Sequence, residues 1–247
     1  MTGIKTRTNF NLLTFIIAIS FVGNATGQSL TNTKINGYRG IWFELDQKYE
    51  YGDKYSGALG TYTAKHVPLA IYAPEVDKTF FVYGGTPSED QRYLLCMIGE
   101  FDHKTEMVSK PTVVYDKNGV DDPHDNPSIL IDNAGYIWVF ISGRGTTRPG
   151  YKYKSKMPYS IKEFVQITEE EMTYPQPRYT DFGFFHFFTK YTGVRQLYFE
   201  TSKDGINWTD DNLLAAIPEK DGEKSGHYQV SDIYNGKLMG TFFNRHP

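Results

Sequence analysis

The sequence has little cysteine, no excess of charge of either sign, and no long apolar run with helical spacing. One cysteine among 247 residues excludes an intramolecular disulfide and a cysteine-rich metal centre. Because Cys96 lies in the apolar run Tyr93–Ile98, we expect a packed thiol. The chain has 26 Lys and Arg against 29 Asp and Glu, whereas nucleic-acid-binding proteins usually carry a basic excess. With 39% hydrophobic and 22% charged residues, we expect a folded protein with one sizeable core and no nucleic-acid partner.

The N-terminal segment has the pattern of an export signal. Two basic residues precede an apolar run from Leu12 to Val22, and Ala25-Thr26-Gly27 is typical of a cleavage site. We therefore expect residues 1–27 to be a signal peptide and residues 28–247 to be a secreted or periplasmic domain. A membrane anchor is the alternative, although the apolar run is short for a span. After cleavage we expect no membrane contact.

Short β-branched and aromatic runs, separated by Gly, Asn, Asp and Pro, follow the signal segment. The clearest runs are 79–83, 136–141, 184–188 and 237–243. A turn marker precedes each run, at Asp77, Asn133, Asp181 and Asn235, which lie 48 to 56 residues apart. Another strand-like run precedes each marker, and two further runs follow in the first three units. Four strands per unit of about 50 residues are the signature of a propeller blade.

The expected fold class is therefore all-β, a β-propeller of sialidase-like type. About three and a half blades are present, and propellers close with about four to eight, so we expect the C-terminal blades to be missing. The piece Gly37–Trp42 is a candidate to complete the last blade, and an irregular β-sandwich is the alternative fold. In the third unit, Ser202–Trp208 resembles the Asp-box turn, whose Asp holds its own backbone and whose Trp packs between blades.

Four residues lie at the entrances to the first strands of successive units. They are His66, His124, Tyr174 and His227, and they are spaced 50 to 58 residues apart. Equivalent entrances in successive blades would aim these side chains at one axis, where a propeller has its channel mouth. The spacing therefore predicts a pocket lined by titratable and hydrogen-bonding groups.

Several cations are placed to join this pocket. Candidates for substrate binding, together with His227, are Lys65, Arg144, Arg178 and Lys190. Arginine and lysine suit a carboxylate or sulfate group, and arginine binds it with two parallel hydrogen bonds. The pattern therefore favours an anionic polysaccharide or oligosaccharide as partner; the sequence does not indicate an oligomeric state.

The motifs Asp122–Asn126 and Thr173–Pro175, the turn Ser202–Trp208 and the stretch Tyr51–His66 resemble the BNR/Asp-box family of exported proteins, which is related to ulvan-lyase-type seven-bladed propellers. The resemblance implies that His124 lies in an active site and that Tyr174 transfers protons. Uronate β-elimination needs a group that neutralises the carboxylate, a base and an acid. The candidate catalytic residues His124, Tyr174 and His66, together with a cation, meet these needs.

The sequence departs from the lyase pattern where those enzymes carry a second histidine, because Ser142-Gly143-Arg144 stands there and Arg144 is the candidate replacement. A glycosidase, including one resembling α-L-rhamnosidases or five-bladed arabinanases, therefore stays open. So does a carbohydrate-binding propeller without catalysis.

No motif assigns a cofactor. Three histidines at one channel mouth are suitable ligands for Zn²⁺, and Asp121, Asp122 and Asp125 for Ca²⁺, but neither spacing is a recognised metal motif. We therefore assign no metal ligand.

Overall fold

The computed structural model describes residues 66–87, 91, 93–192, 194–215, 228–235 and 237–243. The expected signal segment, the piece Gly37–Trp42 and the candidate site residues Lys65 and His227 lie outside these residues. Within the described part of the chain, no helix is long and apolar enough to cross a membrane.

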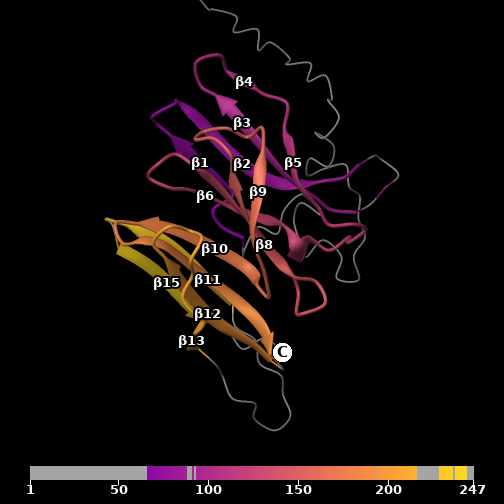
Figure 1. The fold of residues 1–247 in the computed structure, drawn as a ribbon, viewed down its shortest axis with the longest axis vertical. Coiled ribbons are helices and arrows are strands. Elements are labelled where there is room, and N and C mark those ends of the chain that lie inside the picture. Colours follow the sequence, from indigo (N-terminus) through magenta and orange to yellow (C-terminus); the bar gives the residue numbers. More distant parts are fainter. Residues whose placement is uncertain are drawn as a thin grey trace, which may run out of the picture. The chain divides into compact units, whose positions relative to one another are not determined.

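The described strands form four antiparallel sheets that follow one another along the chain (Figure 1). Sheet 1 contains β1 (Ala70–Ala73), β2 (Lys78–Gly85), β3 (Leu95–Asp102), β4 (Met107–Val108) and β5 (Thr112–Asp116). Sheet 2 contains β6 (Pro127–Ile131), β7 (Ile137–Ile141), β8 (Gly150–Ser155) and β9 (Phe164–Glu170), after a 3₁₀ turn, η2 (Pro123–Asp125). Sheet 3 contains β10 (Thr173–Thr180), β11 (Gly183–Thr192), β12 (Val194–Ser202) and β13 (Asn212–Ala215). Sheet 4 contains β14 (Tyr228–Tyr234) and β15 (Lys237–Phe243).

Each sheet begins with a hairpin at one of the turn markers found in the sequence. The β1–β2 and β14–β15 turns place Asp77 and Asn235 at φ of 54° and 48°, in the left-handed region that Asp and Asn tolerate best. The β6–β7 and β10–β11 turns use Gly135 and Gly183, at φ of 82° and 102°. The repeated hairpin confirms the predicted phase of the units. Beyond it, sheets 2 and 3 continue as simple meanders, whereas β4 and β5 of sheet 1 both pair with β3.

The first strands of successive sheets are neighbours in space. Strand β6 contacts β1 and β10, and β10 in turn contacts β14. This places the entrances to the first strands next to one another, as a blade arrangement requires and a two-layer sandwich does not.

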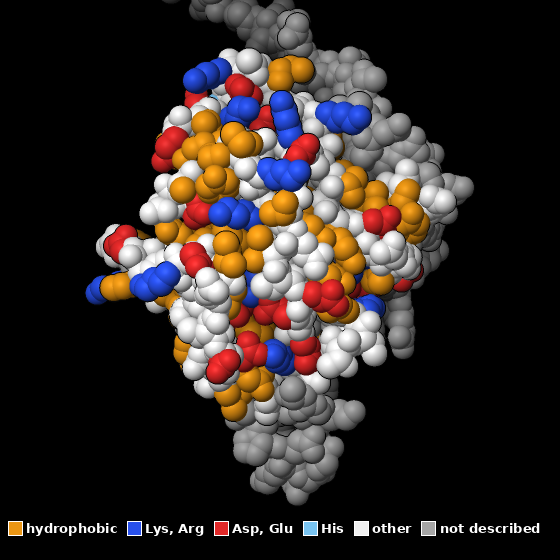
Figure 2. Space-filling model, viewed as in Figure 1, with side chains coloured by type: hydrophobic (Ala, Val, Ile, Leu, Met, Phe, Trp, Pro, Cys, Tyr) orange, Lys and Arg blue, Asp and Glu red, His pale blue; other side chains and the backbone are white. Residues whose placement is uncertain are grey.

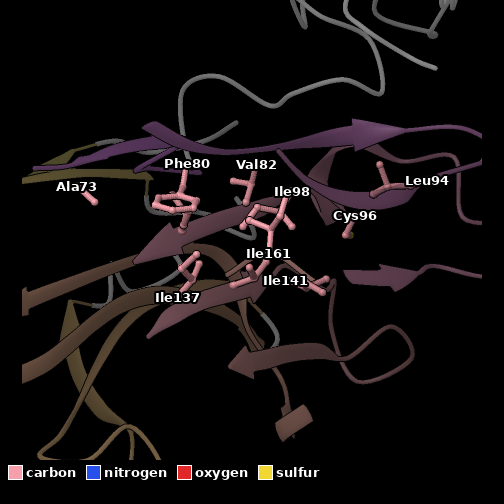
Figure 3. Close-up of a cluster of buried hydrophobic side chains, with 11 residues drawn as sticks. Ala73, Phe80, Val82, Leu94, Cys96, Ile98, Ile137, Ile141 and Ile161 are labelled. Carbon is pink, nitrogen blue, oxygen red and sulfur yellow. The ribbon is translucent and has the colours of Figure 1, made fainter. Parts of the chain in front are cut away.

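The core lies between the faces of consecutive sheets, as the strand β7 illustrates. Its residues are all buried: Ile137 and Ile141 face sheet 1, while Trp138 and Phe140 face sheet 3. Figure 3 shows the first of these layers, with Phe80, Val82 and Ile98 of sheet 1 opposite Ile137 and Ile141. A strand buried on both faces is continuously apolar, which explains the run at 136–141.

The turn Ser202–Trp208 is built as the sequence predicts. The Asp204 carboxylate accepts hydrogen bonds from the backbone N–H groups of Ile206 and Asn207, both at 2.8 Å, and these bonds lower its pKa. The Trp208 ring lies 6.0 Å from that of Phe140 in sheet 2 and 5.8 Å from that of Phe184 in sheet 3. The turn therefore joins two sheets.

Charges of both signs are interleaved on the face shown in Figure 2, among scattered apolar side chains. Acidic side chains gather in the lower part of that face, and basic side chains are more frequent above them.

Candidate active site

Three of the four residues predicted in phase come together. His66 directly precedes sheet 1, His124 lies in η2 before sheet 2, and Tyr174 is the second residue of β10 in sheet 3. The Tyr174 ring centroid lies 5.7 Å from that of His66 and 5.7 Å from that of His124. The His66 Nε2 also lies 3.0 Å from the backbone oxygen of His124. The repeat spacing therefore predicted a real cluster; His227 lies outside the described residues.

The backbone of Tyr174 is held in an unusual conformation by its neighbours. Its φ is 57°, and the pairing of β10 with β11 shifts register between Thr173 and Gln176. Its N–H donates to the Ser142 hydroxyl at 3.2 Å, and its carbonyl accepts from the Gln229 amide at 3.2 Å. Left-handed φ in a residue other than glycine costs free energy and persists only where surrounding contacts impose it. Sheets 2 and 4 both supply such contacts.

Asp122 connects His124 to two arginines. One carboxylate oxygen accepts hydrogen bonds from His124, from the backbone N at 3.0 Å and from Nδ1 at 2.5 Å. The other accepts from Arg144 Nη1 at 3.1 Å and Arg148 Nη2 at 2.7 Å. Burial raises the pKa of Asp122, but the hydrogen bonds and charge of His124 and the Arg148 bond outweigh it, so its pKa falls well below the usual range.

A second carboxylate supports the same arrangement from inside. Asp125 is fully buried and pairs with Lys117 at 2.8 Å and with Arg148 at 3.1 Å. Among the described residues of this cluster, three cations (Lys117, Arg144 and Arg148) therefore stand against two carboxylates, Asp122 and Asp125. The surplus is positive, which favours an anionic ligand.

Exposure differs sharply among the members of the cluster. The Arg144 side chain is 40% exposed, and its guanidinium lies 5.7 Å from the centre of the Tyr191 ring. His124 is 8% exposed, whereas His66 and Tyr174 are fully buried. Arg144 therefore forms the solvent-facing edge, with His124 behind it and Tyr174 deepest.

The structure gives two of the predicted substrate-binding cations other partners. Arg178 is buried in β10 and donates to the backbone carbonyl of Ser231 in β14, so it links sheets 3 and 4. Its burial lowers its pKa to about 10. Lys190 pairs with Asp211 on the outer side of sheet 3. Lys65 lies outside the described residues.

Within the described residues, one group of acidic side chains has metal-ligand spacing. Oxygens of Glu170, Glu200 and Asp211 lie within 4.8 Å of one another. Lys152 already pairs with both glutamates, and Lys190 pairs with Asp211. Each carboxylate thus has an ammonium partner, two lysines serving three acids, and this group does not involve the aspartates or histidines considered from the sequence.

Sequence reasoning missed the connecting role of Asp122 and the contributions of Arg148 and Tyr191. Asp122 stands two residues before His124, where an Asp caps a turn by accepting the N–H of the second residue on, and that signal is local. The other two contacts join residues 26 apart (Arg148 to Asp122) and 47 apart (Arg144 to Tyr191), and nothing in a single sequence marks such pairs.

No family model and no curated relative matches the sequence. The class of fold is nevertheless confirmed by solved structures: the chain has the architecture of the β-propellers found among polysaccharide lyases.

The most similar structures include an ulvan lyase of polysaccharide lyase family PL25, solved alone and bound to -[GlcA(1-4)Rha3S]-. The bound form gives a TM-score of 0.62 at 18% identity, covering 74% of this chain and 46% of that chain, and the unbound form gives 0.61. The polysaccharide lyase Uly1 gives 0.52 at 11% identity, covering 81% of this chain and 55% of that one. The chain therefore spans about half the length of these structures, and at these identities the likeness establishes the fold alone.

Proposed function

We propose that the protein is an exported propeller that cleaves an anionic polysaccharide by β-elimination at a uronate. The observation that carries the proposal is the convergence of His124 and Tyr174 beside Arg144, which is exposed and positively charged. His124 and Arg144 lie in loops of sheet 2 and Tyr174 lies in sheet 3, so the packing of two sheets brings them together. The PL25 fold likeness is consistent with this assignment.

Each chemical need of the reaction has a matching group. In β-elimination a base takes the proton from C5, a double bond forms between C4 and C5, and the C4–O bond breaks as the leaving oxygen takes up a proton. His124 and Tyr174 are the groups proposed to move these two protons. Arg144 is proposed to bind the C6 carboxylate and stabilise the negative charge that develops there.

His66 fits a supporting role better than the catalytic role expected from the sequence. It is fully buried, its Nε2 lies 3.0 Å from the His124 backbone oxygen, and its ring packs beside Tyr174. We therefore place His66 behind the reacting groups.

A second function, carbohydrate binding without catalysis, is favoured by one specific observation. Tyr174 is fully buried, so a substrate reaches its hydroxyl only if covering groups are displaced. A propeller that binds glycans at the Arg144 edge needs no such displacement. The two functions differ in one measurable respect, namely the formation of product.

The test adds the purified protein to a panel of uronate polysaccharides, ulvan included, and follows the ultraviolet absorbance of unsaturated uronate. We expect a rise, reduced by about 10² to 10⁴-fold in His124→Ala and Tyr174→Phe, as for loss of a proton-transfer group. His103→Ala and Tyr234→Phe are controls, because both residues are exposed and lie elsewhere, His103 in the β3–β4 turn and Tyr234 at the end of β14. Sugar released without unsaturation identifies a hydrolase, and glycan binding without product identifies the second function.

A further inference from the structure

The carboxylate of Asp122 divides its two oxygens between two tasks. Oδ1 accepts from the backbone N and Nδ1 of His124, at 3.0 and 2.5 Å, so it fixes both the residue and its ring. Oδ2 accepts from Arg144 and Arg148, at 3.1 and 2.7 Å. His124, proposed to transfer protons, and Arg144, proposed to bind the carboxylate, are therefore both held by Asp122.

The charge of Asp122 determines which nitrogen of His124 carries the proton. An ionised carboxylate only accepts hydrogen bonds, and the arginines keep Asp122 ionised by lying against its second oxygen. The contact of 2.5 Å with this carboxylate therefore favours a proton on Nδ1, and Arg144 Nη1, which lies 3.4 Å from the same nitrogen, donates to Oδ2 instead. In the neutral ring, Nε2 is then the nitrogen that accepts a proton.

The Asp122 carboxylate is itself held in place by a network of ion pairs and hydrogen bonds. Arg148 bridges Asp122 to the fully buried Asp125, at 2.7 and 3.1 Å, and Lys117 pairs with Asp125 at 2.8 Å. Lys117 also donates to the carbonyl of Ser142 at 3.1 Å, and the Ser142 hydroxyl accepts from the Tyr174 N–H. The carboxylate is thus tied to the same scaffold that positions Tyr174.

We propose that Asp122 is the positioning residue of this site: it sets the tautomer of His124, so that Nε2 is the proton-accepting atom, and holds Arg144 at a fixed place beside it. The proposal rests on the proposed function for its catalytic consequence, but its structural content, the tautomer of His124, is independent of that function. It predicts that removing the charge of Asp122, with its shape kept, changes the protonation pattern of His124 before it changes the fold.

The informative variant is Asp122→Asn. The amide oxygen still accepts from the arginines, while the amide N–H₂ donates to Nδ1 and thereby moves the ring proton to Nε2; this orientation gives up the bond that the His124 backbone N–H makes to Oδ1. If the protein cleaves a uronate polysaccharide, we expect kcat to fall by at least about 10²-fold with a smaller change in KM. Asp102→Asn is the matched control, because Asp102 also accepts two backbone N–H bonds, from Lys104 and Thr105, but in the β3–β4 turn.

The decisive readout is nitrogen-15 NMR of ring-labelled histidine, which distinguishes the two tautomers without any assay of activity. His124 is assigned by the signal that disappears in His124→Ala. We expect the Nδ1–H tautomer in the wild-type protein and in Asp102→Asn, and the Nε2–H tautomer in Asp122→Asn. Because the wild-type tautomer is assigned without the Asp122→Asn variant, an unfolded Asp122→Asn protein does not prevent a decision.

The outcomes separate this proposal from the proposed function. An Nε2–H tautomer in the wild-type protein overturns the proposal, as does an Asp122→Asn variant with wild-type kcat on a glycan that the protein cleaves. An Nδ1–H tautomer that switches in Asp122→Asn supports it even if no polysaccharide is cleaved, in which case the proposed function alone fails.

Discussion

Replacing Lys152 by methionine is predicted to lower the free energy of unfolding by about 3 to 5 kcal/mol at neutral pH. The Lys152 side chain is 1% exposed, and its Nζ lies 2.5 Å from Glu170 Oε1 and 2.7 Å from Glu200 Oε1. Nζ also lies 4.0 Å from the centre of the Trp208 ring. Methionine keeps the length and the apolar stem but leaves Glu200, which is only 3% exposed, without its ammonium partner. Removal of one member of a buried ion pair is costly because the other charge stays desolvated.

The cost is predicted to shrink as the pH falls. Burial raises the pKa of Glu200, and the positive charge of Lys152 opposes this rise. The Nδ1 atom of His186 lies 2.7 Å from Glu200 Oε1. Burial lowers the pKa of His186, and the positive charge of Lys152 lowers it further. Without Lys152, both groups bind a proton more readily in the folded protein. The folded state of the variant then gains protons relative to the unfolded chain, so its stability rises on acidification compared with that of the wild type.

Urea unfolding at neutral and mildly acidic pH measures both effects. The control is Lys156→Met, which breaks the exposed Lys156–Glu163 pair, with side chains 54% and 64% exposed, and should change stability by less than about 1 kcal/mol. Equal losses for the two variants, or a Lys152→Met loss that does not depend on pH, would refute the reasoning.

Three further predictions follow from single contacts. Arg144→Gln should weaken binding of a uronate oligosaccharide at least about tenfold in calorimetry, because a charged hydrogen bond is lost, whereas equal affinity would place the anion elsewhere. Gly205→Ala should lower the free energy of unfolding in urea by about 1 to 3 kcal/mol more than Gly119→Ala. Both glycines have positive φ, but only the Cβ added at position 205 would lie 2.4 Å from the Trp138 ring. The buried Cys96, whose pKa burial raises to about 12, should resist iodoacetamide until the protein unfolds; rapid alkylation of the folded protein contradicts this.

The sequence was most informative where a signal repeats. The hairpin markers at Asp77 and Asn235 recur because each sheet opens with the same tight turn, and that phase also brings His124 and Tyr174 together. Local chemistry was equally readable: Asp204 holds its own turn through hydrogen bonds to residues two and three positions on.

Side-chain direction was not readable, as Arg178 shows. Arg178 is a cation in the first strand of a unit, where the sequence predicted residues that line the pocket. In the structure its side chain donates to the carbonyl of Ser231. Pro175 signals the register shift between Thr173 and Gln176, but no residue type shows to which side Arg178 turns. The pair of Lys152 with Glu200, 48 residues apart, likewise arises from the stacking of sheets 2 and 3 and is invisible before the fold is known.

The innermost strands are joined to one another by side chains that donate to backbone carbonyls: Ser128 to Pro175 at 2.5 Å and Gln176 to Gln229 at 2.7 Å, with Gln229 returning a bond to Tyr174. Every amino acid offers the same carbonyl, so the acceptor position places no demand on the identity of its residue. Evolution is therefore free to exchange the acceptor residue in one sheet while the donor in the next stays fixed. Adjoining sheets joined in this way can therefore diverge in sequence independently and still fit together. This freedom suits a fold of repeated units in which the residues of each unit take on different roles.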